Sequence, residues 1–211
     1  METLTRDYWQ KAFANLAAAF NDEKMFLCQL DGAIGDGDHG ASMARGFSEA
    51  LNQFHSLGES PDIAALFLTT GNAFLSKVGG VTGVIFGTLF IEAGKKAEGL
   101  TEIDPPALAA MLDGALEGIK KRGNVREGDK SMVDALAPAL AALKQRTEER
   151  ADWNEVMEAM AESARQGMEA TKQMAGKVGR VRYQKEKGLG HVDPGSASVA
   201  IIFRTLQESL K

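Results

Sequence analysis

The sequence lacks several features that mark common classes of protein. Cys28 is the only cysteine among 211 residues, which excludes an intrachain disulfide and metal sites built from cysteine clusters. Acidic residues outnumber basic ones by 29 to 24, whereas proteins that neutralise nucleic-acid phosphates are normally basic. No run of about 18 apolar residues occurs, and the polar start of the chain has no signal-peptide core. We therefore expect a cytoplasmic protein that binds neither nucleic acid nor membrane.

Convincing β-strands are also absent, because apolar residues recur at helical rather than alternating spacing along most of the chain. Helices are predicted at residues 5–20, 41–54, 61–75, 83–97, 104–119, 132–143, 153–174 and 196–210. Ser60 and Pro61 form the cap and first residue of the third of these. Residues 1–211 are thus predicted to form a single all-α domain of about eight helices, joined mostly by short antiparallel connections.

Glycine, in contrast, is abundant, with 23 among 211 residues, where about 7% is typical. The glycines cluster at residues 32–46, 79–87, 123–128 and 176–195, which are junctions between the predicted helices. Glycine within a helix costs about 1 kcal/mol relative to alanine, so a helical fold favours glycines at helix ends. That preference does not explain the charged residues among them, and each cluster is therefore a candidate site.

The first cluster carries three carboxylates. A G-x-G-x-x-G pattern spans residues 35–40, but no strand precedes it, which argues against a dinucleotide-binding fingerprint. An EF-hand is excluded because the twelfth position counted from Asp36 is Phe47 rather than glutamate. Any single aspartate here is most simply a turn former or helix cap. Asp31, Asp36 and Asp38 together, in a loop without regular structure, favour a Mg²⁺ site that bridges phosphates.

The second and third clusters are less specific. Residues 79–83 precede an apolar helix. They either present N–H groups to an anion, or they are a loop with glycines for packing and Thr82 as the N-cap of that helix. Residues 123–131 nearly spell a P-loop, but Asp129 is inserted before Lys130 and no strand precedes them. A helix that stops at Gly123 and an Asp-capped restart explain part of this pattern.

The fourth cluster is a loop of about 20 residues, a length that is usually functional or disordered in compact domains. It is basic within an acidic chain. It is either a solvated mobile loop or a lid that brings Arg180 to a phosphate and closes with the turn at 193–195. With only three histidines, the chain shows no Ser-His-Asp or Cys-His arrangement.

The four clusters, in this order, resemble the DhaL family, the nucleotide-binding L-type subunits of dihydroxyacetone kinase. The resemblance is carried by Leu30, Asp31, residues 36–40, Met43, Gly46 and Phe47; by residues 78–80, Gly83 and 86–88; by residues 128–130, Met132, Asp134 and Pro138; and by Gly179, Arg180, Tyr183, Gly190, His191 and 193–195. It covers essentially the whole chain. It implies a closed up-and-down barrel of about eight antiparallel helices, with the nucleotide bound on the loops at one end.

The resemblance also implies roles for individual residues. Two Mg²⁺ ions would be held by Asp31, Asp36 and Asp38 against the phosphates of ADP or ATP. The nucleotide itself would be contacted by His39, Gly40, Ala41, Ser42, Gly79, Gly80, Val81, Thr82, Gly123, Met132, Arg180, Asp193, Pro194 and Gly195. Two departures from the family pattern are Val81–Thr82 after the paired glycines and the basic stretch 181–187.

The implied activity is phosphoryl transfer to dihydroxyacetone or a similar short ketose, which a separate K-type subunit holds on a histidine. We expect ADP to stay bound as a cofactor that a phosphotransferase-system protein recharges. One alternative is an ATP-exchanging subunit that serves a four-carbon ketose or a fatty acid. Others are an ADP-loaded regulatory subunit that binds a transcription regulator, and a non-catalytic scaffold, which leaves the three aspartates unexplained. The acceptor, the donor and the oligomeric state, with a homodimer among the options, stay open.

Overall fold

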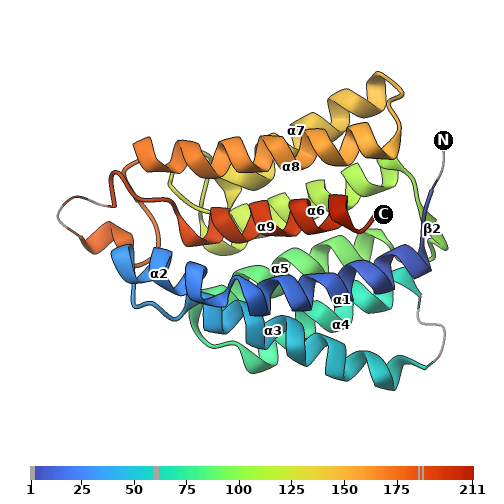
Figure 1. Cartoon of the computed structure of the whole chain (residues 1–211), viewed down its shortest axis with the longest axis horizontal. Coiled ribbons are helices and arrows are strands. Elements are labelled where there is room, and N and C mark those ends of the chain that lie inside the picture. Colours follow the sequence, from blue (N-terminus) through green and yellow to red (C-terminus); the bar gives the residue numbers. More distant parts are fainter. Residues whose placement is uncertain (1–2, 59–61, 185, 187) are drawn as a thin grey trace.

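The computed structural model describes residues 3–58, 62–184, 186 and 188–211 (Figure 1). Over these residues the α-helices are α1 (Arg6–Asp22), α2 (Lys24–Ile34), α3 (His39–Phe54), α4 (Ile63–Lys77), α5 (Gly80–Lys96), α6 (Pro105–Gly123), α7 (Val133–Glu148), α8 (Trp153–Ala170) and α9 (Pro194–Glu208). The 3-10 turns are η1 (His55–Leu57), η2 (Thr171–Gln173) and η3 (Val181–Tyr183). In the described part of the chain, the sheet is limited to β1 (Leu4–Thr5) paired antiparallel with β2 (Glu102–Ile103). The all-α prediction is confirmed.

The helices form a closed barrel in which, from α2 onward, each helix reverses the direction of the one before it (Figure 1). Helices α1 and α2 are separated only by Glu23 and together make one broken rod along the barrel (Figure 1). From α2 to α9 each helix packs against the next. Helix α9 also packs against α1 and α2, which closes the ring. Counting the broken rod once, the structure agrees with the predicted up-and-down barrel of about eight helices.

Helix α2 is the element that the sequence did not predict. Only Leu27 and Ile34 of this helix are buried, while Met25 and Phe26 keep 66% and 45% of their surface exposed. The apolar residues therefore do not follow one helical face. As a consequence Asp31, expected in an irregular loop, lies in the last turn of a helix.

Several helix ends also differ from the predictions. Residues 80–82, expected in a loop, form the first turn of α5. Helix α4 begins at Ile63 and is capped by Asp62, whose side chain accepts the Ala65 N–H; the predicted start at 60–61 lies outside the described residues. No helix among the described residues is long and apolar enough to cross a membrane.

The barrel interior is filled by aromatic rings. Phe47 packs edge-on against Phe74 and Phe90, with ring centroids 5.2 and 5.6 Å apart, and Phe13 meets Phe67 at 5.1 Å in the same manner. Such edge-to-face pairs add roughly 0.5–1.5 kcal/mol each beyond the burial of their area. The core thereby holds the helices in fixed register and positions the loops at each end.

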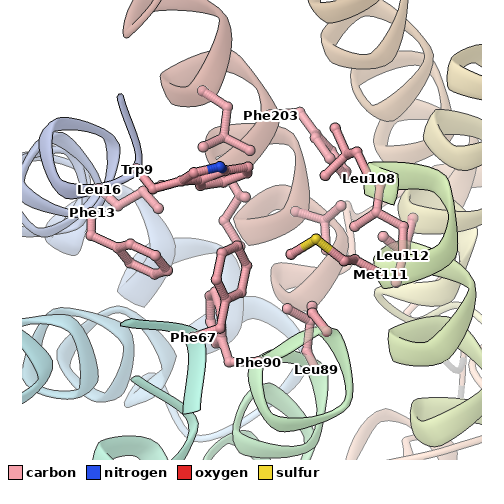
Figure 2. A pocket seen from close by; sticks show the side chains of 15 residues that line it. Trp9, Phe13, Leu16, Phe67, Leu89, Phe90, Leu108, Met111, Leu112 and Phe203 are labelled. Carbon is pink, nitrogen blue, oxygen red and sulfur yellow. The ribbon is translucent and has the colours of Figure 1, made fainter. Parts of the chain in front are cut away.

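One small cavity remains in this core (Figure 2). Its lining is entirely apolar, includes Trp9, Phe13, Met111 and Phe203, and encloses about 40 Å³. None of the predicted site residues lines it, so it is a feature of barrel packing.

Candidate functional site

The barrel gathers helix N-termini at one end. Because the helices alternate in direction, α3, α5, α7 and α9 all begin where α2, α4, α6 and α8 finish (Figure 1). The first-turn N–H groups of a helix have no partner within the helix, and the helix dipole favours negative charge there. All four glycine-rich clusters fall at this end. The arrangement suits an anion such as a phosphate.

Three carboxylates meet beside the start of α3. Ligand oxygens of Asp31, Asp36 and Asp38 all lie within 4.8 Å of one another. Asp31 Oδ2 accepts the N–H groups of Asp38 at 3.0 Å and His39 at 3.2 Å, which fixes its orientation. Asp31 is half-buried, and the other two aspartates are exposed. The structure thus brings the three predicted metal ligands together.

Two glycines allow this convergence. A side chain at Gly35 would collide with Asp31 Oδ1, so the absence of one leaves room for the carboxylate. A Cβ at Gly40 would lie 2.9 Å from the backbone nitrogen of Cys28, so glycine lets α3 approach the backbone of α2. Helix α2 carries Asp31, and this close packing therefore sets the position of that carboxylate relative to the loop.

The electrostatics of the cluster fit a cation. Partial burial and, less strongly, the Asp36 carboxylate raise the pKa of Asp31, although the N–H groups of His39, Asp38 and Gly37 oppose the shift. A divalent cation would offset both the desolvation and the repulsion. Hard carboxylate oxygens are the donors that Mg²⁺ prefers. The residues present therefore fit a magnesium site.

His39 joins three of the helices that begin here. Its side chain is 7% exposed, with Nε2 2.8 Å from Ser198 Oγ in α9 and Nδ1 3.4 Å from Thr82 Oγ1 in α5. Burial lowers the pKa of His39 to about 4, so the ring is neutral at pH 7. A neutral, inward-facing ring cannot pair with phosphate as a cation. His39 instead fixes the spacing between α3, α5 and α9.

The predicted phosphate loop is the start of α5. Gly79 is the N-cap, and a Cβ at Gly79 or Gly80 would meet no atom within 4 Å, so the surface is open there. Val81 is 69% exposed. Thr82 does not cap the helix, which corrects the alternative offered by the sequence, because its hydroxyl lies against His39.

The third cluster contributes Gly123 and Met132 to the same end. Gly123 is the last residue of α6, and a Cβ on it would lie 3.3 Å from Ile85 of α5. Met132, the N-cap of α7, is buried against Gly195.

The predicted restart with an aspartate as helix cap is wrong, because the N-cap of α7 is Met132 and no side chain caps it. Asp134 supplies the carboxylate, which accepts the N–H groups of Gly128 at 2.5 Å and Ser131 at 2.7 Å.

The fourth cluster folds back over the carboxylates. Arg180 forms an ion pair with Asp36. Asp193 caps α9 by accepting the Ser196 N–H at 2.7 Å, and Pro194 is the first residue of that helix. Asp193 keeps some accessible surface, yet its carboxyl group is surrounded by protein, and this desolvation raises its pKa to about 7. The predicted contact residues from all four clusters thus lie at one end of the barrel.

Two polar residues in this region were not predicted as site residues. Ser198 bonds His39 from within α9, and Lys130 is only 1% exposed in the turn before α7. Ser198 does not stand out in the sequence, and Lys130 does so only within the pattern that nearly spells a P-loop. The burial of either residue depends on partners far along the chain.

An all-helical barrel that presents three carboxylates, four helix N-termini and an arginine at one end can hold a metal–phosphate complex. Comparison with known families points the same way. The family described as DAK2 domain matches residues 33–208. The chain therefore belongs to the DAK2 domain family, which confirms the resemblance seen in its motifs.

Relatives match over nearly the whole chain. The PEP-dependent dihydroxyacetone kinase 1, ADP-binding subunit DhaL, of Listeria innocua serovar 6a is 36% identical, with 98% of both chains covered. The corresponding ADP-binding subunit of Escherichia coli K12 is 33% identical, with 91% of both chains covered. The D-erythrulose kinase of Mycolicibacterium smegmatis is 31% identical over 94% of this chain, which spans only 34% of that protein.

A solved structure agrees with the fold. The dihydroxyacetone kinase from C. freundii in complex with AMP-PNP and Mg²⁺ superposes with a TM-score of 0.76 at 27% identity. The match covers 99% of this chain and 35% of that one. The chain thus corresponds to about a third of that longer protein.

Proposed function

We propose that this chain is the Mg²⁺–nucleotide-binding subunit of a dihydroxyacetone-type kinase. It acts in the cytoplasm and passes a phosphoryl group to dihydroxyacetone, or a similar short ketose, held on a separate K-type subunit. Bound ADP is recharged by a phosphotransferase-system protein. The observation that carries the proposal is the meeting of Asp31, Asp36 and Asp38 within 4.8 Å beside the N-terminus of α3. Near full-length similarity to subunits named as ADP-binding supports it.

Each part of the site has a role in this proposal. The three carboxylates hold two Mg²⁺ ions, which supply positive charge to the phosphates during transfer. Residues 39–42 and 79–82 lie beside the phosphates at the starts of α3 and α5. Because the His39 N–H donates to Asp31 and the Ser42 N–H to the Asp38 carbonyl, Gly40 and Ala41 supply the N–H groups from α3. Gly123 and Met132 border the base, while Arg180 and residues 193–195 close over the nucleotide.

Calorimetry with Mg-ADP tests the nucleotide site. Asp36→Asn removes one of the three carboxylate ligands and should abolish measurable binding. Asp7→Asn is the matched control, because Asp7 lies in the first turn of α1, is exposed, and shares no contact with the cluster. Unchanged affinity in Asp36→Asn would refute the metal assignment. Equal losses in both variants would show a non-specific effect of charge.

Nucleotide exchange distinguishes the two modes of supply. Bound ADP that survives purification and gel filtration would support recharging in place, and turnover should then require the phosphotransferase-type donor. Rapid exchange with ATP, together with turnover on ATP and the K-type subunit alone, would refute the bound-ADP mode. The neighbouring coding sequences provide an independent check, since they should include such a donor.

A second candidate acceptor is a four-carbon ketose, because the chain is 31% identical to the D-erythrulose kinase of Mycolicibacterium smegmatis over 94% of its length. Parallel assays with dihydroxyacetone and erythrulose, using the same K-type subunit, separate the two. Faster turnover of erythrulose would replace dihydroxyacetone as the proposed substrate.

A further inference from the structure

The lysine in the turn before α7 is buried. Lys130 is 1% exposed and adopts a left-handed backbone conformation with φ of 62°. Lysine is almost never fully buried unless it is paired, because removing an ammonium group from water is costly. The turn itself is already held by Asp134, which accepts the N–H groups of Gly128 and Ser131. The capping of this turn therefore does not explain why a lysine stands there.

The ammonium group reaches the connection between α8 and α9. Lys130 Nζ donates to the carbonyl oxygen of Thr171 at 2.6 Å and to that of His191 at 2.5 Å. These carbonyls stand near the two ends of a stretch whose described residues are 171–184, 186 and 188–193, which we call the closing segment. A Cβ on Gly188 would lie 3.1 Å from Lys130 Cε, so this part of the segment also rests on the lysine stem.

Further hydrogen bonds join the same two ends. The Gly190 N–H donates to the Lys172 carbonyl at 2.8 Å, and the Asp193 N–H donates to Thr171 Oγ1 at 3.0 Å. Between the joined ends the segment carries Arg180 to Asp36. Nearer to Arg180 the segment is also held at Lys177, whose N–H donates to the Asp129 carbonyl at 3.1 Å and whose Nζ donates to the Gly128 carbonyl at 3.0 Å. Lys130 is the side chain that holds both ends of the segment at once.

Two carboxylates oppose the effect of burial on Lys130. Burial lowers the pKa of Lys130, while the carboxylates of Asp193 and Asp134 raise it. Asp193 stands at the end of the closing segment and Asp134 in the first turn of α7. The Lys130 side chain therefore lies between the end of the closing segment and the first turn of α7.

We propose that Lys130 is a positioning residue that clamps both ends of the closing segment and thereby slows the release of bound nucleotide. The effect on nucleotide release rests on the proposed function, whereas the clamp on the closing segment does not. Lys130 acts through the main chain of the segment and through Arg180.

Trypsin tests the clamp directly, because Arg180 and Arg182 lie within the closing segment. Lys130→Met should raise the rate of cleavage after these residues by at least ~10-fold, since charged hydrogen bonds are among the stronger ones and cleavage follows the opened population. Lys144→Met is the matched control, because Lys144 lies on α7, is exposed and pairs with Asp113. It should leave cleavage at these sites unchanged.

Release of a fluorescent ADP analogue gives the second readout. Lys130→Met should accelerate release by a similar factor, and Lys144→Met should not. A folded Lys130→Met protein with wild-type cleavage and release would overturn the proposal, as would equal acceleration in both variants. Faster cleavage with unchanged release would overturn the link to nucleotide retention. Failure of the wild type to bind Mg-ADP would refute the proposed function instead, while proteolysis still tests the clamp.

If Lys130→Met does not fold, hydrogen exchange in the wild type tests whether the two ends of the closing segment are held together. The amides of Gly190 and Asp193, which join the two ends, should exchange at least ~10-fold more slowly than that of Gln184, which is held only within one 3-10 turn by the Val181 carbonyl. Lys130→Gln, which keeps one amide donor, should then show partial loss of this protection. Fast exchange at Gly190 and Asp193 in the wild type would refute the clamp.

Discussion

Gly35 provides a sharp test of how the carboxylate cluster is built. A side chain at this position would collide with Asp31 Oδ1, although the Asp31 main chain would stay in the last turn of α2. Gly35→Ala should therefore displace one ligand group without removing any charged atom. We expect Mg-ADP binding to weaken while the barrel keeps its fold.

The size of the effect follows from the geometry. Changes that move a metal ligand indirectly typically weaken metal affinity by about 10–100-fold, or about 1.4–2.8 kcal/mol. The stability of the barrel should change by only about 1 kcal/mol, because the collision lies at the rim and alanine reduces the entropy of the unfolded chain. Binding should thus fall far more than stability does.

Gly32→Ala is the matched control. Gly32 lies within α2, which Gly35 caps at its C-terminal end. The nearest atom to a Cβ on Gly32 would be Gly37 Cα at 3.9 Å, an ordinary contact. Replacing a glycine within a helix should stabilise the protein by up to about 1 kcal/mol and leave binding unchanged. Calorimetry and urea unfolding measure the two quantities. Wild-type affinity in Gly35→Ala, or an equal loss in Gly32→Ala, would refute the account of Asp31.

Two further predictions concern stability. Burial raises the pKa of Asp193 from its ordinary 3.8 to about 7. Between these pH values the native chain therefore binds more protons than the unfolded chain. The contribution of Asp193 to the free energy of unfolding consequently falls as pH rises from about 4 to 7. Asp193→Asn keeps a helix cap and should remove this contribution. Urea unfolding of the wild type and the variant across this pH range measures it. The same dependence of unfolding free energy on pH in both proteins would contradict the prediction. Met111→Ala enlarges the core cavity of about 40 Å³ and should cost about 2–5 kcal/mol without weakening Mg-ADP binding, because the cavity contains no site residue. A matching loss of affinity would show that the core and the site are coupled.

Local patterns predicted the helices and their antiparallel connections, while the closed barrel and the single end that binds nucleotide were implied by the family resemblance. Helical periodicity defines the long rods, and alternating direction then places every second junction at the same end. It did not reveal α2, since Leu27 and Ile34 alone are buried there and Met25 and Phe26 face outward. The placement of Asp31 on a helix was missed for the same reason.

Side-chain contacts that depend on the folded backbone were beyond such patterns. Asp129 and Asp134 both lie near the turn at 128–131, and only the folded backbone shows that Asp134 accepts its N–H groups. The burial of Lys130 depends on carbonyls of residues 171 and 191, which no local spacing indicates.

The chain enters and leaves the barrel at the end remote from the carboxylates (Figure 1). Leu4 and Leu210 border the same surface hollow there. Barrel helices of 15 to 19 residues span roughly 25 Å at 1.5 Å per residue. A domain fused at either terminus must bridge that length to reach the site, which takes at least about eight extended residues of linker. A tether that does so brings millimolar effective concentration, whereas a separately encoded partner must find the site by affinity alone.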